Sequence, residues 1–409
     1  MKILQLCKKF PFPLKDGESI AVTNLSKSLK NLGCEITLLA MNTSKHYMDI
    51  QLLPENFKEI YATIKTVGID NHIKPWGAFL NLFEKESYHV TRFISKDFEK
   101  QLIETLQSNV FDVVQLETIF LAPYIPIIRK YSNALVAIRS HNVEHEIWER
   151  VSQTSTNLFK RYYLKLLNPK LKRFETTQLN NCDVLLPITE RDLLLFRKLG
   201  FNKKAIVTPL GIEDSDYRLR EASTRKPFAI SFIGSLDWMP NQEGLKWFLD
   251  NVWKPFFKED IEIEFHIAGR NAPAWISTIK QRNIFFHGEI ENAHKFLAQR
   301  PVMIAPLFAG SGIRVKILES MALERVVIST SLGLEGVNAT DNKEVIIADT
   351  PEQFRDAILF CKENPLKAKK IGSFARNFVI KSFDGANIAL NVLKTYQSLI
   401  PAKIIQERV

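Results

Sequence analysis

Two glycines and two cations stand close together in the segment GSGIRVKILESMA, where they are Gly310, Gly312, Arg314 and Lys316. Glycine lets a backbone approach an anion closely, and the free N–H groups and dipole of a helix N-terminus favour negative charge. Two cations in a first helical turn oppose that dipole unless an anion with more than one charge lies between them, and a diphosphate fits this description. Glu319 follows about one and a half turns further, where a carboxylate can accept hydrogen bonds from ribose hydroxyls. The alternative is an ordinary crossover with a solvated basic turn, and spacing alone favours neither.

The segments around this loop predict how it is held. Residues 301–306 form a short apolar run typical of a buried strand, residues 317–324 are good helix formers, and residues 326–329 are apolar again. Together they predict a strand, a glycine loop, a helix and a second strand, with a phosphate-sized site where the helix begins.

The size and charge of the chain limit its class. A chain of 409 residues suits two domains, and its hydrophobic fraction of 45% and charged fraction of 24% are those of a globular protein. A net charge of +10 favours acidic partners such as nucleotides, anionic lipid surfaces or nucleic acid. No nucleic-acid recognition module is visible, so nucleic acid is the least favoured of these partners.

Cysteine spacing and the N-terminal segment indicate the compartment. The cysteines, at positions 7, 34, 182 and 361, have neither zinc-site nor redox-pair spacing, which favours reduced structural thiols in an intracellular protein. The first residues do not form a signal peptide, because Lys8 interrupts a short apolar run. No window of about 18 apolar residues exists, so we expect a cytoplasmic protein, or one attached to a membrane only at its surface.

Short apolar strands alternate with helical patterns throughout, which is typical of parallel α/β sheets. A helix is expected over 19–32, ended by Gly33, and another begins near Pro240 with Asn241 as its N-cap. Residues 47–75 give no clear assignment. Strands are expected at 3–6, 35–41, 113–117, 135–139, 184–188, 228–234, 262–268, 284–287, 301–305, 326–329 and 345–348.

The polar segment 211–227 separates two repeats of this architecture and has the composition of an interdomain linker. Two doubly wound domains place the carboxyl ends of two sheets at a cleft, where open α/β sheets bind ligands. A last helical stretch, 385–399, follows the second sheet and is expected to pack on the first domain.

The order of motifs resembles that of the family 4 retaining glycosyltransferases, which have the GT-B fold and use nucleotide-diphosphate sugars. The resemblance covers nearly the whole chain, and the segment 310–322 is its most specific part. With 333–336, GLEG, it is closest to a bacterial branch that works on cell-surface polysaccharides. The other segments that carry it are Pro11–Glu18, Ser140–Glu144, Thr208–Glu213, Phe232–Leu236, Ile267–Gly269 and Phe286–Ile290.

The resemblance implies two Rossmann-like domains facing across a cleft. It places an acceptor-side domain at 1–210, a linker at 211–227 and a donor-binding domain at 228–384, with the helix of 385–409 packing back on the first domain. It implies catalytic roles for Arg314, Lys316 and His141. The donor-binding residues that it implies are Gly17, Gly234, Ser235, Gly310, Ser311, Gly312, Ile313, Leu318 and Glu319.

This chain departs from the family pattern at two places. The family has two glutamates eight positions apart; Glu319 matches the one that binds ribose, but Ser311 replaces the one that lies against the donor sugar. In the loop after the first donor-domain strand, Ser235 replaces an arginine, and Asn241 or Gln242 stands near a lysine position. Phosphate-neutralising charge is therefore missing from that loop, and the two cations of the segment 310–322 are expected to supply it from the other side.

Asp214 and Asp216 resemble the metal site of the other large glycosyltransferase fold, but hinge loops are rich in such residues and a structural role is favoured. No metal and no cofactor is expected beyond the nucleotide-diphosphate sugar, which is a substrate. The basic and aromatic stretch 160–173 fits either an anionic membrane surface or the solvated face of a helix broken at Pro169, and the second is favoured.

The sequence thus predicts a retaining, metal-independent hexosyltransferase acting on a glycan or lipid-linked acceptor, at the inner face of the membrane or free in the cytoplasm. Two alternatives remain open: a sugar-nucleotide epimerase, and a catalytically weak protein of the same fold that binds a nucleotide sugar or a partner enzyme. A dinucleotide-dependent oxidoreductase is less favoured, because Pro11-Phe12-Pro13 follows the first strand in place of a tight glycine fingerprint.

Overall fold

The computed structural model describes residues 1–72, 80–81, 84, 86–154, 158–217, 227–260, 262–310 and 312–400. The chain divides into two compact units. One contains Met1–Gly211 together with the segment that begins at Gly385, and the other is Ile212–Asp384. The chain therefore leaves the first unit at Gly211 and returns to it at Gly385.

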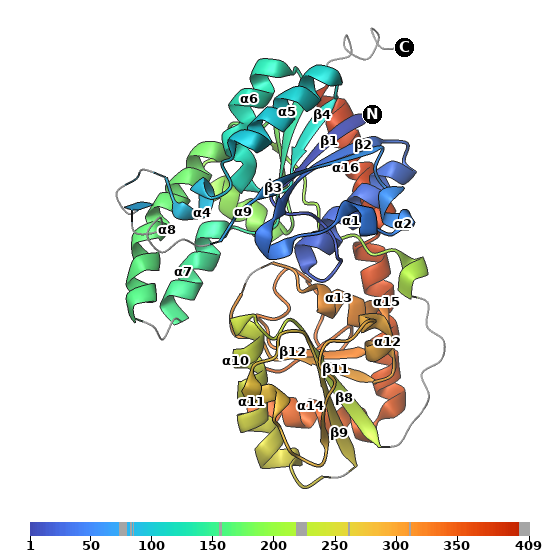
Figure 1. Cartoon of the computed structure of the whole chain (residues 1–409). Helices are drawn as coiled ribbons and strands as arrows, with labels where there is room; N and C mark the ends of the chain where they lie inside the picture. The colour runs from blue at the N-terminus through green and yellow to red at the C-terminus, as the bar shows by residue number, and fades with distance from the viewer. Residues whose placement is uncertain are drawn as a thin grey trace. The chain divides into compact units, whose positions relative to one another are not determined.

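The first unit is built on a parallel sheet of seven strands in the order β3-β2-β1-β4-β5-β6-β7 (Figure 1). Its strands are β1 (Lys2–Cys7), β2 (Glu35–Thr43), β3 (Thr63–Ile69), β4 (Val113–Leu116), β5 (Leu135–Ser140), β6 (Val184–Pro187) and β7 (Lys204–Ala205). Its helices are α1 (Gly17–Asn31), α2 (Glu55–Lys58), α4 (Tyr88–Thr91), α5 (Lys96–Ser108), α6 (Ile125–Tyr131), α7 (Glu144–Thr154), α8 (Leu158–Leu179), α9 (Glu190–Lys198) and α16 (Gly385–Leu399), with short 3₁₀ turns η1 (Ser44–His46), η2 (Ile50–Leu52) and η4 (Ile119–Tyr124).

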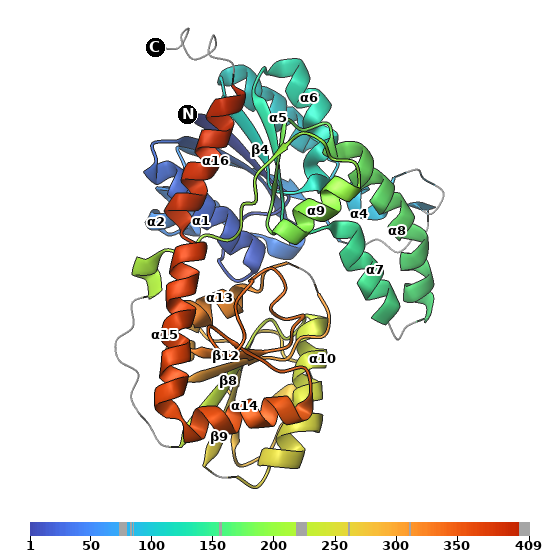
Figure 2. The ribbon, with the colours of Figure 1, turned by 180° about the vertical axis from the view of Figure 1, so that it is seen from behind.

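Alternation along the strands explains the two layers that cover this sheet. In β1, Leu4 and Leu6 enter a core on one face, whereas Ile3 and Cys7 enter a core on the other. The second of these cores includes residues of α1 and α16, and Figure 2 shows α16 lying beside α1. The final helix of the chain is thus part of the first unit.

The start and end of α1 follow from its sequence. The side chain of Asp16 accepts a hydrogen bond from the Ser19 N–H and so caps the first turn, and Glu18 complements the dipole there. Gly33 has a φ of +84° just past the end, which a residue with a side chain rarely adopts.

The second unit has six parallel strands in the order β10-β9-β8-β11-β12-β13. They are β8 (Phe228–Ile233), β9 (Ile263–Ala268), β10 (Ile284–Phe286), β11 (Val302–Ala305), β12 (Val326–Ser329) and β13 (Ile346–Ile347). The helical segments are the 3₁₀ turn η5 (Asp214–Tyr217), α10 (Met239–Phe248), the π-helix η6 (Leu249–Phe257), α11 (Ala274–Ser277), α12 (Ala293–Ala298), α13 (Val315–Ala322), α14 (Pro351–Glu363) and α15 (Pro365–Ser382). Two doubly wound parallel sheets confirm the predicted fold class.

Strand order reverses at one place in each sheet. In the first unit the reversal lies between β1 and β4, and in the second it lies between β8 and β11. Open α/β sheets bind their ligands beyond the carboxyl ends of the strands at such a switch point. The loop that follows β11 is the one that contains Gly310 and Gly312, so the topology carries the predicted phosphate loop to the switch point of the second sheet.

The structure adds to or differs from the sequence-based expectations at three places. Residues 63–69, for which no element was predicted, form β3. It is an edge strand, and its half-exposed positions can hold polar residues such as Thr and Lys without cost, which hides the usual apolar pattern. The helix α8 continues through Pro169, because Leu164, Leu167 and Leu171 are buried on either side of it and their packing offsets the local cost of proline.

The third concerns Asn241, which lies inside α10, where Trp238 is the N-cap. The side-chain amide of Asn241 instead donates to the Ser235 carbonyl. It therefore holds the preceding loop in place of capping the helix.

All four cysteines are buried and free. No helix in the described ranges is long and apolar enough to cross a membrane.

Candidate functional site

The glycine loop of the second unit has the backbone geometry that only glycine adopts freely. Gly310 and Gly312 have φ angles of +106° and +75°. The chain then enters α13 at Val315, with Arg314 as an N-cap residue whose side chain makes no capping hydrogen bond. The first N–H groups of a helix generally lack an intrahelical acceptor and can bind an anion; in α13 the Ile317 N–H already donates to the Arg314 carbonyl, which leaves those of Val315 and Lys316 as the candidates. Ser311, between the two glycines, lies outside the described residues.

The side chain of Arg314 folds back over this loop. Its Nη1 donates to the carbonyl oxygen of Gly312. A Cβ placed on Gly310 would lie 3.3 Å from the Arg314 guanidinium, so the guanidinium and the loop backbone are neighbours. Positive charge is thus held directly beside the N-terminus of α13.

Lys316 crosses from α13 to the loop that follows β8. Its Nζ donates to the Asn241 Oδ1 at 3.0 Å and lies 4.5 Å from the centre of the Phe232 ring. A Cβ on Gly234 would lie 3.3 Å from this Nζ, so the loop after β8 lies directly against the ammonium of α13. Burial of the ammonium, with a smaller effect of the Arg314 charge, lowers the pKa of Lys316 to about 7. An uncompensated cation of this kind is stabilised by a bound anion.

Ser235 has a cationic neighbour that sequence reasoning did not identify. The Nε of Arg270 donates to the Ser235 Oγ at 2.8 Å, and the Leu236 N–H donates to the Arg270 carbonyl. Arg270 follows β9, the strand next to β8. The charge that is missing from the loop after β8 is therefore present beside it, supplied by the neighbouring strand. A cation directly after the strand-ending Gly269 was the signal in the sequence.

Glu319 is held by two aromatic neighbours. Its Oε1 lies 3.4 Å from the His294 Nε2, and burial together with the nearby Glu319 charge raises the pKa of the Tyr217 hydroxyl. The rings of Tyr217 and His294 are in contact, with centroids 4.5 Å apart. The hydrogen bond with Glu319 is the main cause that raises the pKa of His294. The carboxylate is thus oriented by η5 and α12.

The remaining predicted donor residues lie on the same element. Ile313 is half-buried directly before α13, whereas Leu318 is fully buried within it. The Leu318 side chain therefore packs inside the unit. Residues of the glycine loop, α13 and the loop after β8 are brought together at the switch point.

Gly17 and His141 belong to the first unit. Gly17 begins α1 and is exposed, and the residues beside it form ion pairs: Asp16 with the Lys9 Nζ at 2.7 Å, and Glu18 with the Lys8 Nζ at 3.4 Å. His141 follows β5, and its Nε2 lies 3.2 Å from the Glu117 Oε2 at the end of β4. Both loops stand at the carboxyl ends of strands near the switch point of the first sheet.

Comparison with known proteins decides the family. Residues 227–364 match the glycosyl transferases group 1. The matched region contains the glycine loop, both cations and Glu319. The second unit therefore contains a group 1 glycosyltransferase domain.

A curated relative and two solved structures extend the likeness to nearly the whole chain. An uncharacterized 44.6 kDa protein in the cps region of Klebsiella pneumoniae is 21% identical over 408 residues, which cover 96% of this chain and 99% of that one. Anabaena HepE in complex with UDP and glucose has a TM-score of 0.67 at 12% identity, covering 97% of this chain and 100% of that one. Sucrose-phosphate synthase from Thermosynechococcus elongatus has a TM-score of 0.71 at 13% identity, covering 98% and 99%. These structures show that the chain has the GT-B fold.

The paired aspartates have a structural explanation. Asp214 of η5 forms an ion pair with Arg376 of α15 within the second unit. Within the described ranges, no group of three or more His, Cys, Asp or Glu side chains is arranged to hold a metal ion.

Proposed function

We propose that this glycosyltransferase is a retaining, metal-independent hexosyltransferase. It moves a sugar from a nucleotide-diphosphate sugar to a glycan or lipid-linked acceptor in cell-surface polysaccharide synthesis. The observation that carries the proposal is the meeting of Arg314, Lys316 and two positive-φ glycines at the N-terminus of α13. This arrangement offers the charge and the N–H groups that a diphosphate requires.

Each donor contact has a chemical reason. The glycine loop, the N-terminus of α13 and the two cations would hold the diphosphate, and Glu319 would accept hydrogen bonds from the ribose hydroxyls. As the bond between sugar and phosphate breaks, negative charge builds on the leaving diphosphate. Cations and N–H groups that are already in position stabilise this charge without reorganisation. They also provide the positive charge that a metal ion would otherwise supply.

The relatives support the class of donor and the pathway. HepE has been crystallised with UDP-glucose as well as with UDP and glucose, and the Klebsiella relative is a protein of a cps region. We therefore expect a uridine-diphosphate sugar to be the first donor worth testing. The first unit would hold the acceptor, with Gly17 and His141 as its candidate substrate contacts. The leaving phosphate would accept the acceptor proton, so a protein base is not required.

Stereochemistry and metal dependence test this proposal. We expect slow hydrolysis of UDP-α-glucose in the absence of an acceptor, with the α anomer of glucose appearing first by ¹H NMR before mutarotation. Chelation with EDTA should leave the rate unchanged. An initial β anomer would contradict retention, and a rate abolished by EDTA and restored by Mg²⁺ would contradict metal independence. Binding of UDP-glucose without hydrolysis or transfer to any glycan tested would favour the catalytically weak alternative.

The outer face of α8 supports contact with an anionic membrane. Leu164, Leu167 and Leu171 are buried, but the opposite face exposes Phe159 at 90% and Tyr162 at 67%. Phe159, Tyr162 and Leu166 lie three and four residues apart, so they form one stripe along the helix. The exposed cations beside this stripe are Arg161, Lys165, Lys172 and Arg173.

An apolar stripe flanked by cations is suited to the interface of an anionic bilayer. We therefore place the enzyme at the cytoplasmic face of the membrane in this proposal. Figure 1 shows α7 and α8 as a pair that extends away from the sheet of the first unit.

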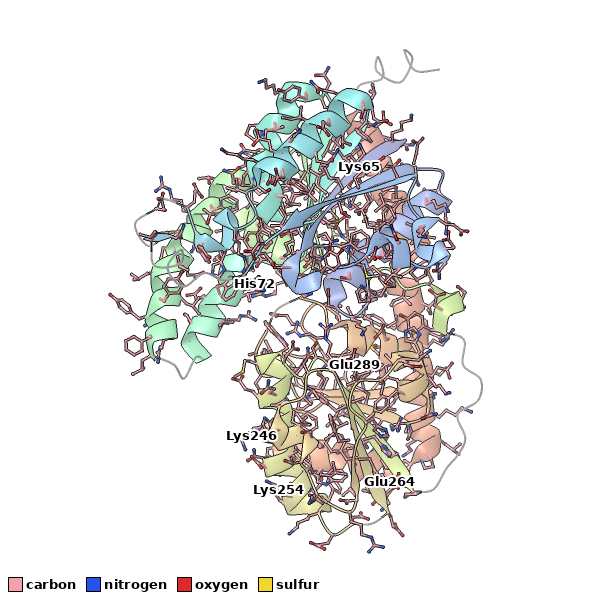
Figure 3. The ribbon with its side chains drawn as sticks, in the orientation of Figure 1. Lys65, His72, Lys246, Lys254, Glu264 and Glu289 are labelled. Carbon is pink, nitrogen blue, oxygen red and sulfur yellow. The ribbon has the colours of Figure 1, made fainter. Side chains whose placement is uncertain are left out.

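Vesicle binding tests the membrane contact. The wild type should sediment with vesicles of phosphatidylglycerol and phosphatidylcholine, and the fraction bound should fall at least fivefold for Phe159→Ser combined with Arg161→Gln and Lys165→Gln. The matched control is Leu366→Ser with Lys246→Gln and Lys254→Gln, which removes one exposed apolar side chain and two exposed lysines from the second unit (Figure 3). Equal binding of both triple variants, or binding to pure phosphatidylcholine as strong as to the anionic vesicles, would contradict an electrostatic contact through α8.

A further inference from the structure

A buried polar cluster lies beneath His141 in the middle of apolar strands. Gln5 of β1 and Gln115 of β4 are register partners, and Glu117 follows Gln115 by two residues, so all three side chains lie on the same face of the sheet. They are between 1% and 2% exposed. Polar side chains at such positions cost stability unless every group is satisfied, so their presence calls for a role.

The cluster converges on the Glu117 carboxylate. Its Oε1 accepts from the Gln5 Nε2 at 2.6 Å and from the Gln115 Nε2 at 2.5 Å. Its Oε2 lies 3.2 Å from the His141 Nε2 and 3.7 Å from the Arg139 Nη1. One oxygen is therefore occupied by two amides and the other by the histidine and a buried guanidinium.

Two hydroxyl groups fix the orientation of the amides. Ser26 of α1 donates to the Gln5 Oε1 at 2.9 Å, and Tyr396 of α16 donates to the Gln115 Oε1 at 2.7 Å. Because each amide oxygen already accepts a hydrogen bond, each amide NH₂ turns toward Glu117. The C-terminal helix thus reaches the histidine through Tyr396, Gln115 and Glu117.

The charge of Glu117 decides the tautomer of His141. Burial acts to raise the pKa of Glu117, but the hydrogen bond from His141 and the charge of Arg139 outweigh it, and the pKa lies below its usual value. An ionised carboxylate only accepts hydrogen bonds, so the His141 Nε2 must carry a proton. In the neutral ring the Nδ1 is then the acceptor, on the side away from Glu117.

We propose that Glu117 is a positioning residue that fixes the ring and the Nε2–H tautomer of His141, with Tyr396 and Gln115 completing the support. The inference rests on the proposed function in one respect: the partner of the His141 Nδ1, on the side of the ring away from Glu117, is a group of a substrate of the transfer reaction. A ring fixed in this way presents the same nitrogen to the ligand in every turnover. Positioning groups of this kind act through orientation, so their loss changes turnover more than affinity for the nucleotide.

Glu117→Gln is the decisive variant, because its amide can donate to the Nε2 and so favours the opposite tautomer. We expect the ¹⁵N shifts of the His141 ring to change from the Nε2–H to the Nδ1–H pattern, with His141→Gln used for assignment. With UDP-glucose as donor, kcat for hydrolysis should fall at least about tenfold. The rise in Tm caused by saturating UDP should equal that of the wild type.

A second buried carboxylate in the same unit is the matched control. Glu175 accepts a hydrogen bond from the His145 Nδ1 and from two backbone N–H groups, so Glu175→Gln disturbs a similar pair without touching His141. It should lower Tm while keeping the His141 tautomer and kcat. An unchanged His141 tautomer in Glu117→Gln, or an equal loss of kcat in both variants, would overturn the positioning role. Absence of UDP binding and hydrolysis in the wild type would instead contradict the proposed function, and the tautomer measurement would still test the role of Glu117.

Discussion

Arg314→Ala is expected to reduce kcat by about a hundred- to a thousandfold, the range found when one preorganised donor to a developing negative charge is removed. Arg314 lies over the glycine loop at the N-terminus of α13, where the leaving diphosphate is proposed to bind. Its side chain packs on the loop and contributes little to the core. The Tm and circular dichroism should therefore stay close to those of the wild type.

Rates of donor hydrolysis and of transfer, measured at saturating UDP-glucose, check this expectation. Arg314→Lys should recover part of the rate, because it keeps the charge but not the planar fork of guanidinium donors. Lys246→Ala removes an exposed cation of the same unit and should leave kcat unchanged. Turnover of Arg314→Ala within threefold of the wild type would remove Arg314 from the mechanism.

Binding of UDP-glucose should take up a proton, through Lys316. Because the pKa of Lys316 is about 7 in the unliganded protein, the ammonium loses its proton as the pH rises through 7. A bound diphosphate favours the charged form and raises that pKa. Affinity should therefore be greatest below pH 7 and fall above it, by up to about tenfold per pH unit until the pKa of the complex is reached.

Isothermal titration calorimetry in two buffers of different ionisation enthalpy measures this uptake. UDP-glucose is the suitable probe, because its diphosphate diester keeps the same charge from about pH 6 to pH 9. Proton uptake should rise from near zero at pH 6 toward one at pH 8. Lys316→Met keeps most of the volume of the side chain and should bind more weakly with no uptake at either pH. Uptake that persists in Lys316→Met would show that another group is responsible.

The geometry of the glycine loop was predictable from the sequence because its determinants are local. Glycines at positive φ, a helix that starts just after them and cations in its first turn all fall within a dozen residues of one strand. The same holds for α1, where Asp16 and Gly33 mark both ends. Determinants that lie close together in the chain can be recognised directly in the sequence.

The supporting residues were not predictable in the same way. Arg270 reaches Ser235 only because β9 lies beside β8, and Tyr217 reaches Glu319 from a segment about a hundred positions earlier in the chain. Asn241 has the residue type of an N-cap, but its partners are the Ser235 carbonyl and Lys316. Such roles depend on register between distant strands, which one sequence does not reveal.

The residues that position His141 were only weakly indicated by the sequence. Gln5 and Gln115 are polar residues inside runs that otherwise read as buried strands, and this inconsistency marks a functional or strained place. The two glutamines indicate that a buried polar group lies near the carboxyl ends of β1 and β4. They do not show that Glu117 is the centre of the cluster, because that follows from the pairing of β1 with β4 and from the position of α16.

The central claim is that the second unit binds a nucleotide-diphosphate sugar at the start of α13. Thermal unfolding in the presence of a panel of such sugars, without added metal, tests it most directly, with Arg314→Ala and Glu319→Ala measured beside the wild type. The account predicts that one donor raises the Tm of the wild type selectively and that both variants lose this shift while their unliganded Tm values stay similar. No shift with any donor at millimolar concentration, or an undiminished shift in both variants, would contradict it.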